Sequence, residues 1–303
     1  MKFTNKYNLP KVFERFEKAN AHDKGDSKYS VSTLIDSPRV SKLKGEHRSE
    51  MSVDVSDQLF AILGTAAHLV LESGAGEGEV SEERFFADIP CGDGNIRVSG
   101  QVDLQIQTDK GVRICDFKTT STYSILANPE GKQEWVKQLN CYAALARLNG
   151  VNVSSVEVIA ICRDWSGGNR DRNPDYPLAP VVSVPLPMWR EEVAYDYLVN
   201  RVSAHESDAI PQCTPEEMWA KPTTYAVYEQ LKGGGGLKKR ASKVYDNRTD
   251  AESHIIQVAG SQMEERKGVY TRCEGDYCSV SKWCDQYYGR IKRDQYYGRI
   301  KHG

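Results

Sequence analysis

Two segments in which apolar and polar residues alternate flank a four-residue turn, and their pairing limits the folds open to this chain more than any other feature. The first segment covers Ile96–Ile106 and the second covers Val112–Lys118. Alternation on both sides of a turn predicts an antiparallel β-hairpin. If the residues on either side of the turn pair with each other, Asp103 lies directly opposite Asp116, with Cβ atoms about 4.5–5.5 Å apart.

Two carboxylates at this distance repel each other, so the hairpin needs a positive partner. Lys118 follows Asp116 by two residues and therefore points to the same face of the strand. Hard divalent metals bind carboxylate oxygens, and beside a phosphate they activate water. An ammonium group nearby stabilises the charge on phosphorus. The pattern thus indicates a metal-dependent hydrolytic site. A surface hairpin with an ordinary Asp–Lys pair is the alternative, and a one-residue change in the turn would separate the acids.

The rest of the chain alternates between helical and extended patterns. Apolar residues at three- and four-residue spacing predict helices over 10–20, 57–72, 134–148 and 191–205, with a shorter helix at 32–35. Short apolar runs predict strands over 156–162 and 181–184. The helix over 57–72 has the strongest pattern and ends at a cluster of glycines.

Composition divides the chain into an N-terminal helical and basic segment over 1–56, a core over 57–205 and a C-terminal module over 206–303. Lysine and arginine exceed the acidic residues near both ends, whereas the middle is acidic, although the net charge is only −2. This distribution suits a polyanionic partner, with an unevenly charged solvated surface as the alternative. In the C-terminal module we expect Gly233–Gly236 to form a hairpin loop or mobile tip.

No run approaches the roughly 18 apolar residues that a membrane span needs, and the N-terminus lacks the apolar region of a signal peptide. We therefore expect the chain in a reducing cytoplasm and in contact with no membrane. The eight cysteines serve better there as metal ligands or packing residues than as disulfides. Residues 285–292 are repeated as a tandem copy at 294–301, for which we expect no structural role.

Four short motifs follow one another in and around the hairpin. They are Gly64-x3-His68-x3-Glu72, Gly100-x2-Asp103, Asp116-x-Lys118 and Gln138-x3-Tyr142. In this order they resemble the motifs of the RecB-type branch of the PD-(D/E)XK nuclease superfamily. The surrounding elements are also similar to those of stand-alone phage and prophage nucleases of this superfamily.

The resemblance implies an α/β fold of the restriction-endonuclease-like type, with a mixed central sheet flanked by helices. By the same resemblance, Asp103 and Asp116 are the principal metal ligands and His68 completes the metal shell. Lys118 is the catalytic lysine. The metal is Mg²⁺ or Mn²⁺, and an imidazole ligand suits Mn²⁺ somewhat better.

The remaining motif residues receive roles from the resemblance as well. Gln138 and Tyr142 organise the site and the incoming DNA strand, with the Tyr142 ring stacking on bases. Glu72 either helps to position metal or water or is a solvated helix residue, and both interpretations stay open.

Three cysteines in the C-terminal module, Cys273, Cys278 and Cys284, have the spacing C-x4-C-x5-C. Thiols this close together in a reducing compartment indicate a metal centre. Several RecB-type nucleases hold a [4Fe–4S] cluster with such a triplet and one distant cysteine, and the resemblance implies the same here. This sequence departs from theirs because its first gap is four residues rather than two, and because no cysteine precedes the His68 helix. Structural zinc on the same sulfurs is the alternative.

The fourth sulfur ligand must then come from within or after the core. Cys213 is the first choice because it opens the C-terminal module, and Cys91 is the second. Cys115, Cys141 and Cys162 fall inside predicted strands or helices, where we expect them to pack in the core.

These observations favour a Mg/Mn-dependent deoxyribonuclease, an exonuclease that hydrolyses DNA ends or single strands in phage-type recombination, repair or degradation. DNA is the expected partner, with phage or host recombination and replication proteins beside it. No Gly-x4-Gly-Lys-Ser/Thr sequence is present, so the sequence given contains no ATP-driven helicase motor. Two other functions remain open: a DNA-binding or recombination protein without catalysis, and a protein whose iron–sulfur cluster senses redox state.

Overall fold

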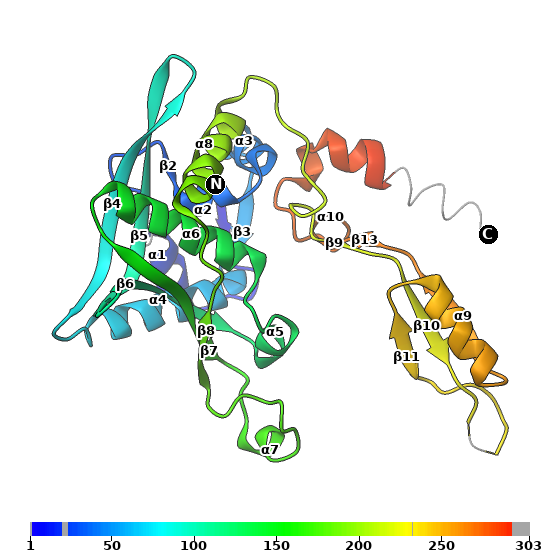
Figure 1. Ribbon diagram of the computed structural model, residues 1–303. Helices are drawn as coiled ribbons and strands as arrows, with labels where there is room; N and C mark the ends of the chain where they lie inside the picture. The colour runs from blue at the N-terminus through cyan, green and yellow to red at the C-terminus, as the bar shows by residue number, and fades with distance from the viewer. Residues whose placement is uncertain (1, 20–23, 232, 293–303) are drawn as a thin grey trace. The chain divides into compact units, whose positions relative to one another are not determined.

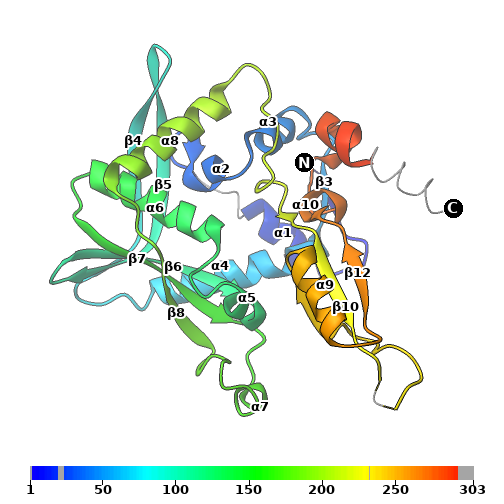
Figure 2. The same ribbon diagram turned by 45° about the vertical axis from the view of Figure 1, so that its right-hand side comes forward.

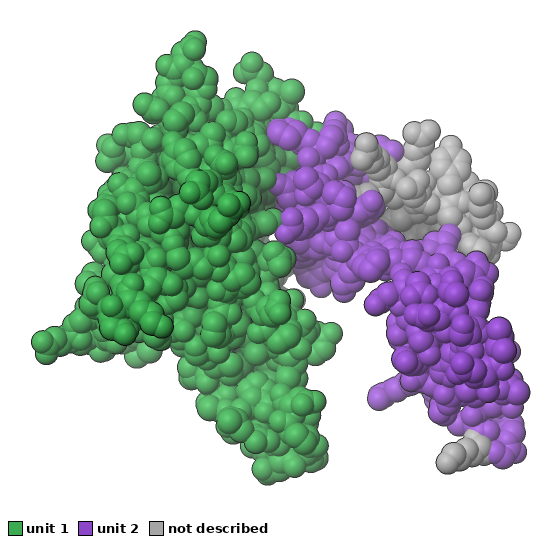
Figure 3. All heavy atoms as spheres, in the orientation of Figure 1, with its two compact units in different colours: residues 1–210 green, residues 211–303 purple. Residues whose placement is uncertain are grey.

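The structure is a computed structural model, and it describes residues 2–19, 24–231 and 233–292. The chain divides into two compact units, residues 1–210 and residues 211–303 (Figure 3). Residues 1–56 and residues 57–205 both fall in the first unit. Among the described residues, no helix is long and apolar enough to cross a membrane. The second copy of the tandem duplication, 294–301, lies outside the described residues.

A mixed six-stranded sheet forms the centre of the first unit (Figure 1). Its strands are β2 (Tyr29–Ser30), β4 (Glu79–Cys91), β5 (Gly94–Thr108), β6 (Gly111–Thr120), β7 (Val153–Cys162) and β8 (Val181–Pro185). The strand order is β2-β5-β6-β7-β8, and β4 pairs with β5. Antiparallel pairs join β4 to β5, β5 to β6 and β7 to β8, whereas β6 runs parallel to β7. The predicted mixed sheet is confirmed.

The hairpin of β5 and β6 has the register that the sequence predicts. Gln107 pairs with Val112 across the turn, and the ladder extends to Leu104. It ends one position before Asp103 and Asp116, the two residues that this register brings opposite each other. The turn therefore sets which acidic side chains meet at the end of the ladder.

Strand β4 is missing from the sequence prediction. It pairs with β5 along almost its whole length and joins it through a tight turn between Cys91 and Gly94. Gly92 in that turn has a φ of +59°, which glycine adopts without strain. The strand escaped detection because its apolar and polar residues do not alternate, and because Pro90 lies near its end.

Helices α2 (Val31–Ile35), α6 (Gln133–Leu148) and α8 (Glu191–Glu206) pack on the sheet and on one another (Figure 2). Leu139 and Leu145 of α6 share one hydrophobic core with Val102 and Ile114 of the sheet and Leu198 of α8. Burying each such side chain stabilises the fold by about 1.5–3 kcal/mol. This core fixes the strands from which the acidic side chains project.

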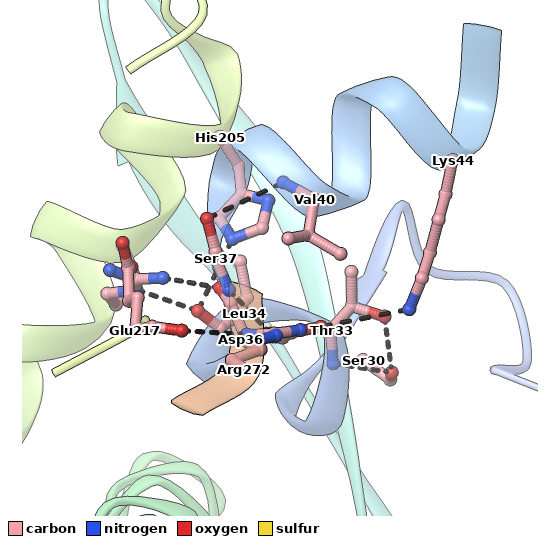
Figure 4. A network of polar contacts seen from close by, with 11 residues as sticks. Ser30, Thr33, Leu34, Asp36, Ser37, Val40, Lys44, His205, Glu217 and Arg272 are labelled. Carbon is pink, nitrogen blue, oxygen red and sulfur yellow. Dashed lines mark hydrogen bonds and ion pairs between the residues drawn. The ribbon is translucent and has the colours of Figure 1, made fainter. Parts of the chain in front are cut away.

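Polar contacts join the N-terminal helices to α8 (Figure 4). The buried imidazole of His205 lies with Nε2 3.3 Å from the carbonyl oxygen of Leu34. Burial, and then the positive charge of Arg201, lower the pKa of His205. The neutral ring can donate to this carbonyl, and Arg201 donates to the same oxygen at 2.7 Å.

Helix α4 (Leu59–Glu72) differs from the other long helices of this unit because none of its residues is buried. Phe60, Leu69 and Val70 are each more than half exposed, at 58%, 63% and 69%. The helix packs against β6, where Gly64 lies beside the hydroxyl of Thr119. An apolar helical pattern ordinarily faces a core, but here much of it faces outward.

The other elements of the first unit are short. They are β1 (Lys2–Thr4), α1 (Val12–Ala19), α3 (Pro38–Glu46), β3 (Ser52–Asp54), the 3-10 turn η1 (Val55–Gln58), α5 (Thr122–Ala127) and α7 (Gly167–Arg170).

The second unit contains a three-stranded antiparallel sheet with a helix packed on it. Its elements are β9 (Ala220–Lys221), β10 (Thr224–Tyr228), β11 (Lys243–Tyr245), α9 (Arg248–Gln257), β12 (Gln262–Arg266), β13 (Val269–Tyr270), α10 (Thr271–Glu274), η2 (Ser281–Trp283) and η3 (Tyr287–Lys292). The sheet order is β11-β10-β12. Gly233–Gly236, all with positive φ, lie in the loop between β10 and β11, so the predicted hairpin loop is confirmed.

Candidate active site

An imidazole and two carboxylates from three different elements meet at the point where the β5–β6 ladder ends. His68 comes from α4, Glu82 from β4 and Asp103 from β5. The Nδ1 atom of His68 lies 3.5 Å from Oδ2 of Asp103 and 3.6 Å from Oε1 of Glu82. All three ligand atoms lie within 4.8 Å of one another. A divalent cation accepts this set of one nitrogen and two oxygen donors, so the group fits a metal site.

Asp103 is held by the backbone of the neighbouring strand. The N–H of Phe117 donates to its Oδ2 at 2.8 Å, and the ring of Phe117 lies edge-on to the imidazole of His68, with centroids 6.0 Å apart. Burial, and then the negative charge of Asp116, raise the pKa of Asp103 to about 8. A bound cation would offset both effects and favour the carboxylate.

Asp116 and Lys118 form an ion pair on β6. The Nζ of Lys118 lies 2.7 Å from Oδ2 of Asp116, whose side chain is almost fully buried. Burial alone would lower the pKa of Lys118, but the charge and hydrogen bond of Asp116 outweigh it and the pKa of the ammonium is raised. Lys118 is therefore a fixed positive charge beside the acidic group.

The predicted ligand set was His68, Asp103 and Asp116, and the structure arranges these residues in two neighbouring groups. His68 and Asp103 lie together with Glu82, while the carboxylate of Asp116 faces Lys118. Sequence reasoning missed Glu82 because it missed β4. The signal for it is the tight turn before β5: counting back from that turn places Glu82 opposite Asp103.

Gln138 and Tyr142 lie one turn apart on α6 and contact each other. The Nε2 of Gln138 donates to Oη of Tyr142 at 2.8 Å. Burial, and then the charge of Asp116, raise the pKa of Tyr142, so the phenol stays neutral. The ring is buried against Gly100, where a Cβ would lie only 2.8 Å from Cδ1 of Tyr142. The expectation that Tyr142 stacks on DNA bases is therefore corrected: the ring packs in the core, and Gly100 makes room for it.

Glu72 is the last residue of α4 and is exposed. It is not a member of the group formed by His68, Glu82 and Asp103. Of the two interpretations left open by the sequence, the structure favours the solvated helix residue.

Four cysteines lie near one another in the second unit. Burial, and then the neighbouring thiols of Cys278, Cys213 and Cys284, raise the pKa of Cys273 to about 11. The side chain of Gln286 holds the backbone of Cys213 at both polar groups, accepting from its N–H at 2.7 Å and donating to its carbonyl at 3.0 Å. This amide anchors the loop that carries Cys213 to the segment just after Cys284.

The other four cysteines belong to the first unit. Cys115, Cys141 and Cys162 are buried, as predicted. Cys91 lies at the end of β4 and is partly exposed. These four cysteines of the first unit are free thiols.

A mixed sheet that presents an imidazole with buried acids beside an Asp–Lys ion pair is the arrangement expected of a metal-dependent hydrolase. A protein-family model described as the PD-(D/E)XK nuclease superfamily matches residues 63–285. The chain belongs to this superfamily, which indicates a metal-dependent nuclease and implies DNA as the substrate.

Two further comparisons add little to this assignment. No curated protein matches the chain. Among solved structures, one titled "Crystal structure of SSO0001" is 18% identical with a TM-score of 0.47, and the match covers 69% of this chain and 88% of that chain. Nothing about function follows from a likeness of this degree.

Proposed function

We propose that the chain is a RecB-like, Mg²⁺- or Mn²⁺-dependent deoxyribonuclease that acts as an exonuclease on DNA ends or single strands. Phage-type recombination, repair or DNA degradation is the setting that we infer from the motifs. The observation that carries the proposal is the meeting of His68 and Asp103 beside the Asp116–Lys118 ion pair. Superfamily membership supports it, since PD-(D/E)XK enzymes use this kind of site to hydrolyse DNA.

In this proposal Asp103, Asp116 and His68 would hold the divalent cation. When bound, the cation supplies a Lewis acid that activates water and neutralises charge on the phosphate. Water attacks phosphorus in line and the bond from phosphorus to the 3′ oxygen breaks; the proton that the water gives up to solvent is balanced by the proton that the leaving 3′ oxygen takes up.

Lys118 contributes a positive charge rather than a base. Burial opposes the charge, but the charge and hydrogen bond of Asp116 raise the lysine pKa, which favours the protonated ammonium. It can orient the attacking water and stabilise the charge that grows on the phosphoryl oxygens. Gln138 and Tyr142, whose side chains are joined to each other, fix the α6 wall of the site.

We further propose that Cys213, Cys273, Cys278 and Cys284 bind a [4Fe–4S] cluster, with structural zinc as the alternative. After burial, the thiols of Cys278, Cys213 and Cys284 raise the pKa of Cys273, which supports a common site. We propose the reducing cytoplasm as the compartment, where cysteines serve as metal ligands or packing residues rather than in disulfides. Such a centre would stabilise a unit that has only short elements of its own.

The experiment that tests the nuclease proposal is digestion of end-labelled single- and double-stranded DNA with Mg²⁺, Mn²⁺ or EDTA. Covalently closed circular DNA in a parallel reaction separates exonuclease from endonuclease action. We expect the ends to be degraded with either metal, the circle to stay intact and EDTA to stop the reaction. The variant Asp116→Asn is the inactive control. A wild-type chain that binds DNA but never cuts it with Mn²⁺ would instead be the DNA-binding protein without catalysis.

A further inference from the structure

We propose that Glu82 is a direct ligand of the divalent cation, together with His68 and Asp103. None of the four motifs contains this residue. The inference rests on the proposed nuclease function, because it concerns the metal of that site. It assigns a ligand that comes from β4.

The side chains of His68, Glu82 and Asp103 lie close enough together to share one cation. The imidazole Nδ1 of His68 stands between the two carboxylates, 3.6 Å from Glu82 and 3.5 Å from Asp103. The mutual spacing within 4.8 Å is that of atoms sharing one small cation. Within the described part of the chain, no other group of three histidine, cysteine or acidic residues meets this condition.

The pairing of β4 with β5 is interrupted at Glu82. The ladder pairs Ser81 with Leu104 and Glu83 with Val102, and it skips the position between them, where Glu82 faces Asp103. Both residues of the skipped pair are members of the group around His68. The regular pairing is therefore interrupted at the pair whose two side chains both belong to this group.

The backbone of Glu82 has an unusual conformation. Its φ is +54°, a left-handed conformation that a non-glycine residue seldom adopts within a strand. Such strain persists where the surrounding structure imposes it, and it is found most often at functional sites. Here the conformation accompanies the side chain's approach to His68.

A hydrogen bond from Gln101 orients the carboxylate of Glu82. Gln101 donates from Nε2 to Oε2 of Glu82 at 2.6 Å, which leaves Oε1 to face His68. Arg84 in turn donates to Oε1 of Gln101 and fixes the orientation of that amide. A ligand held on one oxygen and presented on the other is typical of metal sites, where a further layer of hydrogen bonds orients the ligands. Gln101 is therefore a positioning residue for Glu82.

The chain offers a matched control in the next residue. Glu83 is also a glutamate of β4 whose carboxylate accepts a hydrogen bond from a glutamine of β5, in its case Gln105. Glu83 is not a member of the group around His68. The substitutions Glu82→Gln and Glu83→Gln remove the same charge at adjacent positions, so Glu83→Gln controls for the loss of a carboxylate on β4 outside the group around His68.

The test is a titration of the full-length protein with Mn²⁺, with free Mn²⁺ measured by electron paramagnetic resonance. We expect Glu82→Gln to weaken Mn²⁺ binding by at least about tenfold and Glu83→Gln to leave it unchanged within about twofold. Asp103→Asn provides the reference for a lost ligand. If Glu82→Gln binds Mn²⁺ as tightly as the wild type, the inference is wrong.

A second variant separates a ligand from a structural residue. Glycine adopts a φ of +54° without strain, so Glu82→Gly should unfold at the same temperature as the metal-free wild type or higher. The rise in melting temperature on adding Mn²⁺ should be much smaller than in the wild type. A lower melting temperature with an unchanged Mn²⁺-dependent rise would overturn the inference.

These measurements do not depend on cleavage. A wild type that binds Mn²⁺ through Glu82 and fails to cut any DNA refutes the nuclease proposal and leaves the ligand assignment intact. A wild type that cuts DNA while Glu82→Gln keeps full Mn²⁺ affinity refutes the ligand assignment alone.

Discussion

The carboxylate of Asp103 accepts a hydrogen bond from the backbone N–H of Phe117, with 2.8 Å between Oδ2 and N. Phe117 stands between Asp116 and Lys118, so this bond attaches one half of the site to the other. It forms just where the regular β5–β6 ladder has ended. Here a hydrogen bond to a side chain replaces the backbone pairing. The position of β6 therefore depends on Oδ2 of Asp103, the same oxygen that faces His68.

Asp103→Asn should make the stability of the metal-free protein less dependent on pH. In the wild type, burial and the charge of Asp116 raise the pKa of Asp103 from its ordinary value of 3.8 to about 8, so the folded state holds a proton that the unfolded chain releases. The stabilising contribution is complete below about pH 4 and is lost as the pH rises towards and through about 8. Asparagine keeps an oxygen for the Phe117 N–H and carries no charge.

We therefore expect Asp103→Asn to be more stable than the wild type at pH 8.5 by about 1–3 kcal/mol, with a smaller difference at pH 5. Chemical denaturation in EDTA, followed by tryptophan fluorescence at several pH values, measures this. Parallel stability profiles for the two proteins would contradict the assignment of the buried proton to Asp103.

Lys118→Met should lower the rate of DNA cleavage by a factor of about 10²–10³ or more, because it removes the charge that stabilises the transition state. It also leaves the buried carboxylate of Asp116 without its partner at 2.7 Å, which costs about 1–3 kcal/mol of stability. The double variant Asp116→Asn with Lys118→Met should recover the stability and none of the activity. Lys110→Met, in the exposed turn of the same hairpin, is the control and should change neither.

Two assays are needed for this prediction: cleavage of end-labelled DNA with Mn²⁺, and DNA binding by fluorescence anisotropy in Ca²⁺. Binding should stay within about twofold of the wild type, since a single phosphate contact contributes little of the total. Cleavage at the wild-type rate by Lys118→Met would refute the role of the lysine.

Gly100→Ala should destabilise the protein by about 1–3 kcal/mol through overpacking. A Cβ at this position would lie 2.8 Å from Cδ1 of Tyr142 and 2.9 Å from Cδ1 of Leu145, so α6 must move away from β5. Gly94→Ala, in the same strand, meets no atom within 4 Å and should be neutral or slightly stabilising. Thermal unfolding of the two variants measures the difference, and equal melting temperatures would show that the contact with Tyr142 is not tight.

Local rules were sufficient to predict the hairpin that carries most of the motifs. A short turn leaves one register for the strands, and the period of two then decides which side chains share a face. The pairing of Gln107 with Val112 therefore followed from the sequence, as did the proximity of Asp103 and Asp116. The same counting from the turn before Gly94 would have revealed Glu82, had β4 been recognised.

Long-range packing limits what such rules can predict. Tyr142 has the chemistry of a base-stacking residue, and only the approach of α6 to Gly100 reveals that its ring is buried. Helix α4 shows the opposite case, because its apolar residues indicate a core helix and yet Phe60 and Val70 are exposed. Periodicity describes one element, whereas burial depends on what the rest of the chain places beside it.

Cys213→Ser should reduce the metal content of the purified protein, because the backbone of Cys213 is anchored by Gln286 beside Cys284 and its thiol influences the pKa of Cys273. Cys91→Ser is the matched control: it removes the sequence's second choice for the fourth ligand, and the metal content should not change.

Elemental analysis for iron, zinc and sulfide on protein purified without oxygen decides between a [4Fe–4S] cluster and zinc. Full metal content in Cys213→Ser and a loss in Cys91→Ser would assign the fourth ligand to Cys91. Absence of both metals from the wild type would remove the cluster from the proposal while leaving the site at Asp103 untouched.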